Sequence, residues 1–302
     1  MSTKKRSLVI ITCLKDKWKF EMLMRSMYAM LEPCDVIIVY NEGAKKYKEW
    51  LDWFLPLKET LLKNFSVRYF KAGDFIDKKD FDFIETSGWH SQQALKLLVY
   101  DQIFTDEYVI LDSKNFFLKN CSLMDIVRSE PHGHWTLKGV TAYTEFMCNY
   151  LDMVYPGHHL KLRANVTPYI MQTKLVRRLV RRWKTHSKFY DWFIDTAKRP
   201  GHSAAEFILY ELWELKMQQR IIDNRPTPTT YSNYATIWHH SLTGQPSANE
   251  IGKWIWDQRN KGILVGGFHS GIHKHINLAD VKLILKMLKI EYILPQAADS
   301  PF

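Results

Sequence analysis

The chain has 302 residues, of which 46% are hydrophobic and 14% aromatic. It is long enough to bury a sizeable core, as one large domain or two fused halves, and it has no apolar run of about 18 residues, so we expect no transmembrane helix. The formal net charge of +10 favours polyanionic partners: nucleic acid, an anionic membrane surface or a phosphorylated ligand.

The first apolar segment, residues 8–14, follows basic residues, as in a signal peptide. The segment is short, ends in Lys-Asp-Lys and lacks a small-residue cleavage site, so we predict a first β-strand instead. The four cysteines are widely spaced and form no C-x-x-C pair. This spacing argues against a cysteine zinc site and indicates reduced, mostly buried thiols in a cytoplasmic protein.

Strand-like and helix-like segments alternate along the first 115 residues. The predicted strands are residues 7–14, 34–42, 65–75 and 107–113. The predicted helices between them are residues 17–31, 49–63 and 90–104. This alternation predicts a single α/β domain whose open, mostly parallel, twisted sheet is flanked by helices.

The second half of the chain is less regular. We predict strands within residues 132–143 and helices over residues 174–197 and 203–219. The expected organisation is a nucleotide-binding half (residues 1–130), an acceptor-binding half (residues 131–275), and a closing helix and tail (residues 276–302).

Asp112 ends the fourth predicted strand, directly after the apolar residues 108–111. In open α/β sheets ligands bind outside the carboxyl ends of the strands, where a carboxylate can hold a metal ion and a phosphorylated substrate. A turn residue is the alternative interpretation. Thr12 and Asn41 end the first two predicted strands, beside the same expected pocket, and we expect Asp16 to cap the helix that follows the first strand.

The segment before Asp112 resembles the GT-A class of glycosyltransferases, in particular a group of bacterial and phage sugar transferases. The shared run comprises Gly88-Trp89, Gln92-Gln93, Lys96-Leu97 and Leu111-Asp112-Ser113-Lys114. The resemblance covers residues 7–120 well and implies a GT-A-like fold, a nucleotide-sugar donor (UDP-sugar) and Mn²⁺ or Mg²⁺ bound at a D-x-D motif. Gln93 and Lys96 are then expected at the donor.

This chain departs from the D-x-D motif, because Lys114 stands where the second acid is expected. Metal binding is then weaker, or Lys114 itself neutralises phosphate charge, as a lysine can do as a point charge. Both interpretations stay open.

A Gly/His segment, residues 266–276, is similar to the late His-x-x-Gly-x-x-Lys segment of retaining GT-A enzymes. The resemblance implies a metal ligand at His269 or His273, and donor diphosphate binding by Gly271 and Lys274. A basic turn before a helix is the alternative.

Glu206 lies three residues after Ser203, a spacing typical of a helix capping box. The resemblance offers a second role, because related transferases carry an acid at such a helix start, facing the acceptor. We therefore predict Glu206 as the acceptor-side base if the enzyme inverts, and as an orienting group if it retains.

Residues 174–188 combine an apolar helical stripe with basic residues and no acid. The cations expected to contact a polyanion are Arg177, Arg178, Arg181, Arg182 and Lys184. A one-signed face of this kind indicates a phosphate track or a membrane-surface helix.

Together these features predict a glycosyltransferase that moves glucose or arabinose from a UDP-sugar to a hydroxyl. The favoured acceptor is 5-hydroxymethylcytosine in phage duplex DNA. The alternatives are a bacterial surface-polysaccharide transferase with peripheral membrane contact, and a non-enzymatic nucleic-acid-binding protein.

Overall fold

The structure is a computed structural model that describes residues 5–76, 88–127, 138–155, 167–199, 205–217, 234–237, 248–268 and 278–290. Within these residues, no helix is both long enough and apolar enough to cross a membrane. All four cysteines lie in the described residues and are free thiols, three of them buried, as the spacing predicts.

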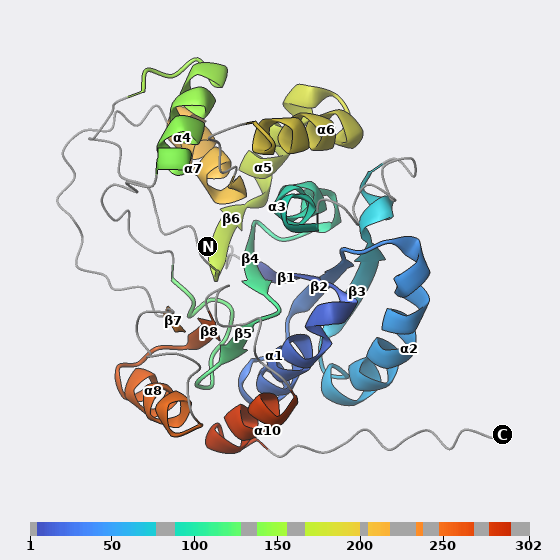
Figure 1. Cartoon of the computed structure of the whole chain (residues 1–302), viewed down its shortest axis with the longest axis vertical. Helices are drawn as coiled ribbons and strands as arrows, with labels where there is room; N and C mark the ends of the chain where they lie inside the picture. Colours follow the sequence, from blue (N-terminus) through green and yellow to red (C-terminus); the bar gives the residue numbers. More distant parts are fainter. Residues whose placement is uncertain are drawn as a thin grey trace.

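The main sheet has five strands in the order β3-β2-β1-β4-β6 (Figure 1). Their bounds are β1 Arg6–Thr12, β2 Asp35–Tyr40, β3 Ser66–Lys71, β4 Glu107–Asp112 and β6 Tyr169–Gln172. The first four are parallel, and β6 runs antiparallel to β4. The predicted α/β class, with an open and mostly parallel sheet flanked by helices, is confirmed.

Alternation along the strands gives the sheet two apolar faces. One face, with Val9, Ile11 and Ile110, packs against helices α3–α7, whereas Leu8, Ile10 and Leu111 pack against the helices of the other face (Figure 1). The first set is α3 Gly88–Leu98, α4 Lys138–Tyr150, α5 Thr173–Val180, α6 His186–Ala197 and α7 Glu206–Met217. The second set is α1 Lys17–Met30, α2 Ala44–Leu61, α8 Ala248–Asn260 and α10 Leu278–Met287.

A second sheet of three short strands, β5-β8-β7, lies beyond β4. It comprises β5 Asn115–Phe117, β7 Tyr234–Ile237 and β8 Val265–Phe268. Strand β8 is antiparallel to β5 and parallel to β7. Because β6 and β8 join strands of the first 130 residues, the two predicted halves share both sheets.

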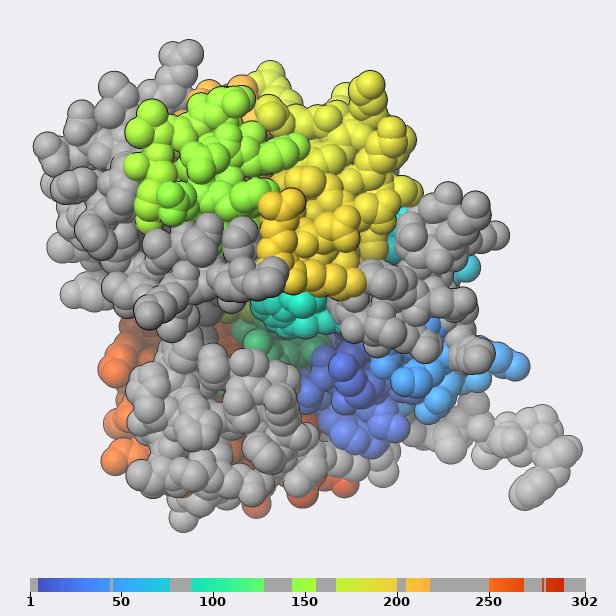
Figure 2. Space-filling view, turned by 45° about the horizontal axis from the view of Figure 1, so that its top comes forward, coloured from blue at the N-terminus to red at the C-terminus, as the bar shows by residue number. Residues whose placement is uncertain are grey.

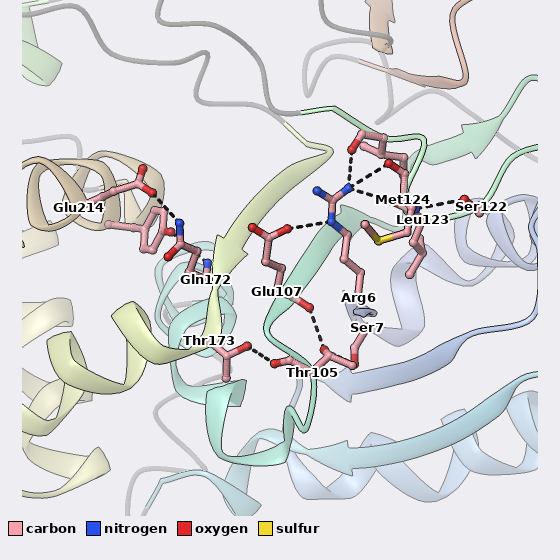
Figure 3. A network of polar contacts seen from close by, with 12 residues as sticks. Arg6, Ser7, Thr105, Glu107, Ser122, Leu123, Met124, Gln172, Thr173 and Glu214 are labelled. Atoms are coloured by element: carbon pink, nitrogen blue, oxygen red, sulfur yellow. Dashed lines mark hydrogen bonds and ion pairs between the residues drawn. The ribbon is translucent and has the colours of Figure 1, made fainter. Parts of the chain in front are cut away.

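The amino-terminal edge of the main sheet is held by polar contacts (Figure 3). Arg6 on β1 donates to the Glu107 carboxylate at 2.9 Å and to the carbonyl of Ile126 at 2.6 Å. At the start of α5, the Thr173 hydroxyl donates to the carbonyl of Thr105 at 2.7 Å. These contacts tie β1, β4 and α5 together at the edge away from Asp112.

Three local predictions are wrong. Residues 138–143, predicted as strand, begin α4, whereas residues 132–137 lie outside the described part of the chain. The helix predicted over residues 174–197 is broken, because Lys184 has φ +65° and the Thr185 side chain caps a new helix by accepting from the backbone N of Lys188. The Asp16 side chain does not cap α1, but binds Lys19 and Ser113.

Candidate active site

Asp112 lies at the carboxyl end of β4, beside the end of β1. The chain runs from β1 outward to β3 and returns on the other side of β1 as β4, so the sheet's topological switch point lies between β1 and β4. In the register of these two strands Asp112 pairs with Ile11. Open α/β sheets bind ligands at such a point, and alternation turns Asp112 toward the face that carries α3 and α7.

Lys96 of α3 joins two carboxylates from distant parts of the chain. Its Nζ lies 3.2 Å from Asp112 Oδ1 and 2.9 Å from Glu206 Oε1, while only 3% of the residue is exposed. The Asp112 contact is an ion pair without a well-aligned hydrogen bond. Burial disfavours the charged ammonium, but the two carboxylates outweigh burial and raise the pKa of Lys96.

Glu206 begins α7 and is 1% exposed. Its carboxylate accepts from Lys96 and also from the amide nitrogen of Gln93. In this orientation of the amide, the Gln93 oxygen accepts from Trp89 Nε1 at 3.2 Å. Burial raises the pKa of Glu206 against the opposing charge of Lys96. The geometry thus presents Glu206 as the anchor of Lys96, and its role as an acceptor-side base stays a prediction.

Lys114 covers the outer side of Asp112. Its Nζ lies 3.4 Å from Asp112 Oδ2, and its side chain is 25% exposed. Burial alone would favour the neutral acid, but the ammonium groups of Lys96 and Lys114 hold the pKa of Asp112 well below its usual range. Asp112 is therefore an ionised carboxylate with a lysine at each oxygen.

Asn115 fixes the backbone of the strand end, a role that sequence reasoning missed. Its Oδ1 accepts from the backbone N of Asp112 at 2.7 Å and from the Thr167 hydroxyl at 2.8 Å. A Cβ on Gly267, its partner residue on β8, would lie 2.4 Å from Asn115 Nδ2. The polar residue three positions after Asp112 was the available signal, but its partners come from elsewhere in the chain.

The two other predicted strand-end residues differ in their surroundings. Asn41 is engaged, since it donates to the carbonyl of Gly88 at 2.8 Å and accepts from the Ser91 hydroxyl at 2.9 Å. The hydroxyl of Thr12 is buried and has no hydrogen-bond partner among the described residues. Asn41 therefore orients the start of α3, whereas the Thr12 hydroxyl at the switch point has no hydrogen bond to the described residues.

The Gly/His residues His269, Gly271, His273 and Lys274 lie outside the described residues. Strand β8, which precedes them, runs toward the site. It is antiparallel to β5, and its Gly267 pairs with Asn115, the residue after Lys114. Within the described residues, no three His, Cys, Asp or Glu side chains form a metal-binding group. With both Asp112 oxygens facing lysines, this part of the chain does not fit the predicted divalent cation.

Helix α3 lies in a recess of the molecular surface. Figure 2 shows α3 recessed between α6 on one side and α1 on the other. Lys96 comes from α3, and its partner Glu206 comes from α7. Next to them, Trp89 is 54% exposed while its indole N–H faces Gln93. Trp89 belongs to the motif shared with the GT-A enzymes, but the motif alone implies no role for it at the site.

The cationic face of residues 174–188 lies away from Asp112. The predicted contact residues are all exposed, whereas the apolar stripe and Trp183 are buried. Strand β6 runs antiparallel to β4, so α5 begins at the amino end of β4, and Arg177 lies over the ring of Tyr100 just before that strand. The cationic face and the strand-end cluster therefore lie toward opposite ends of β4.

Fold and cluster together define an open α/β protein with a charged site at the sheet's switch point. The chain belongs to a family of unknown function, DUF6492, whose model matches residues 3–243. No curated protein matches the chain. A solved structure, a WbbM bifunctional glycosyltransferase in its apo form, is similar at 12% identity with a TM-score of 0.37 over 71% of this chain. The chain spans less than half of that structure's length, 44%.

Proposed function

We propose that this protein is a glycosyltransferase that uses a nucleotide-sugar donor. One observation carries the proposal: Asp112, Lys96, Lys114 and Glu206, from three separate segments, meet at the carboxyl end of β4. Purely structural ion pairs would not need to gather at the topological switch point, where α/β sheets bind nucleotides. The unpartnered hydroxyl of Thr12 at the same edge supports a ligand there.

In this mechanism the acceptor hydroxyl attacks the anomeric carbon of the donor sugar. The bond between that carbon and the diphosphate oxygen breaks, and the nucleoside diphosphate leaves with the electron pair. Lys114, supported by Lys96, offsets the charge that develops on the leaving group, which is the largest electrostatic demand of such a reaction. Asp112 and Glu206 hold the two lysines in place. If the enzyme inverts, the proton of the acceptor hydroxyl passes to the Glu206 carboxylate, the predicted acceptor-side base.

The favoured acceptor is duplex DNA that carries hydroxymethylated pyrimidines. The exposed cations on α5 and the following turn supply a phosphate-binding face, and Trp183 is buried at 9% exposure rather than free to anchor in a membrane. A partner that contacts both this face and the strand-end cluster must extend along the six residues of β4, roughly 20 Å. A duplex has that length, and a polysaccharide acceptor on a lipid carrier is the alternative.

The donor is tested first by thermal unfolding with a panel of nucleotide sugars. A donor at about 100 times its Kd adds about 2.7 kcal/mol to the free energy of unfolding, which shifts the melting temperature measurably. We expect one nucleotide sugar to stabilise the protein and to be hydrolysed slowly without acceptor, and Asp112→Asn to lose both effects while keeping its fold. A protein that binds DNA but neither binds nor hydrolyses any donor is a nucleic-acid-binding module, and the proposal is then wrong.

The acceptor is tested by transfer of labelled sugar to hydroxymethylated duplex. The affinity for duplex should fall with salt, and Arg178→Ala with Arg181→Ala should reduce the slope of log K against log[salt] by about two. Donor hydrolysis without DNA should be unchanged in that double variant. Tight binding to anionic vesicles without transfer to the duplex would favour the polysaccharide alternative.

A further inference from the structure

The charge balance of the strand-end cluster separates this site from one built around a metal ion. Its described members are two carboxylates, Asp112 and Glu206, and two ammonium groups, Lys96 and Lys114. Their charges cancel without any added ion. An acid in place of Lys114 would leave the cluster with two excess negative charges, which one divalent cation would balance.

Lys114 also occupies the space that a metal ion would need. A divalent cation on Asp112 requires a free carboxylate oxygen at about 2.0–2.2 Å. Oδ2 of Asp112 lies 3.4 Å from Lys114 Nζ, and Oδ1 lies 3.2 Å from Lys96 Nζ. A cation on either oxygen would meet an ammonium of the same sign a few ångströms away.

The two lysines are placed for different tasks. Lys96 is 3% exposed and is held by two carboxylates, so it contributes a fixed positive charge behind the strand end. The side chain of Lys114 is 25% exposed and has only Asp112 as its ion-pair partner in the described residues, so it can turn toward a ligand. An ammonium binds phosphate as a compact point charge with three donors.

From this arrangement we infer that Lys114, with Lys96 behind it, takes the place of the divalent cation, and that the donor diphosphate binds without a metal ion. The inference rests on the proposed function and specifies how that site holds its donor. Asp112 then acts as a positioning residue for the two lysines. The diphosphate is the part of the donor that Lys114 recognises, whichever base and sugar flank it.

The experiment measures binding of UDP, GDP, ADP, CDP and dTDP by calorimetry, once with EDTA and once with MnCl₂. We expect at least one nucleoside diphosphate to bind with affinities that agree within about twofold in the two buffers. Lys114→Ala should weaken that binding by about tenfold or more, the loss of one charge-assisted contact. Binding of the matching nucleoside, which has no phosphate, should not change.

Matched variants separate this role from a general effect of lost charge. Lys58→Ala removes a lysine of similar exposure, 24%, that pairs with Glu59 at 2.8 Å on the other side of the sheet, and it should leave binding unchanged. Lys114→Arg should retain most of the affinity. Lys114→Asp restores the two-acid spacing, and its nucleotide binding should appear only with Mn²⁺.

The outcomes distinguish the inference from the proposed function. If the wild-type protein binds a nucleoside diphosphate only with Mn²⁺, the inference is overturned while the proposed function stands. Equal loss of affinity in Lys114→Ala and Lys58→Ala overturns it as well. If no nucleoside diphosphate binds in either buffer, the proposed function falls, and the inference falls with it.

Discussion

Replacement of Lys96 by methionine tests whether the strand-end cluster is a coupled buried unit. The variant keeps the length of the side chain but leaves the Glu206 carboxylate, 1% exposed, without its cation. Removal of one partner of a buried ion pair costs about 3–5 kcal/mol. At roughly 2–4 °C per kcal/mol for a protein of this size, the melting temperature should fall by about 6–20 °C.

The loss should depend on pH, because burial already raises the pKa of Glu206 above its ordinary value of 4.5. Above that value the unfolded chain releases the proton while the folded variant retains it, so Lys96→Met should lose stability as the pH rises from 5 to 8. Glu206→Gln in the same chain should recover most of the loss, since a neutral amide needs no cation.

Urea unfolding at pH 5 and pH 8 measures these free energies for Lys96→Met, for the double variant and for Lys46→Met. Lys46 also pairs with a glutamate, Glu42 at 3.5 Å, but its side chain is 56% exposed, so its loss should cost less than about 1 kcal/mol. If Lys96→Met costs no more than Lys46→Met, or if its loss does not change with pH, Lys96 and Glu206 do not form the buried pair described above.

Three further predictions concern the strand end and the cationic face. The two lysines hold the pKa of Asp112 below its usual 3.8, so ionised Asp112 contributes stability that is present above that pH and lost on acidification. Urea unfolding at pH 5 and pH 3 should therefore show a smaller loss of unfolding free energy in Asp112→Asn than in the wild-type protein. Gly267→Ala should cost about 1–3 kcal/mol, because its Cβ would lie 2.4 Å from Asn115 Nδ2, whereas Gly252→Ala meets only the flexible end of a methionine and should be nearly neutral in the same assay. Trp183→Ala should cost about 3–5 kcal/mol in thermal unfolding, since the indole packs in an aromatic cluster; a neutral result would show that the ring is free for another partner.

The first half of the fold was predictable because its strands are apolar runs bounded by polar residues. Asp112 could be placed at a strand end on that ground alone. The meeting of Lys96 and Glu206 was not predictable, because 110 residues separate them and no local pattern records the contact. Glu206 also lies in a helix that is buried on nearly all sides, so its sequence lacks the polar face that would have shown its orientation.

The errors in the second half have local physical causes. Residues 138–143 are rich in residues that suit a strand, but here they begin a helix that packs on α7. The break at Lys184 follows from its positive φ and from the Thr185 cap, and a threonine three residues before Lys188 was a usable sign of a new helix start. The sequence pattern does not show this break, because basic residues continue on both sides of it and one irregular turn leaves the helical spacing of the apolar residues nearly unchanged.

The pairing of β5 with β8 has a consequence for biosynthesis. Asn115 reaches the carbonyl of Gly266 across 151 positions of the chain, so β5 is synthesised long before its partner strand. At about 5–20 residues per second, the ribosome needs about 8–30 s to make the intervening chain. During that interval Phe116 and Phe117, both fully buried in the finished fold, lack the strand that pairs with them. The nascent protein therefore exposes an aromatic strand edge next to its unfinished site, and this is the segment that a chaperone on the ribosome would be expected to shield.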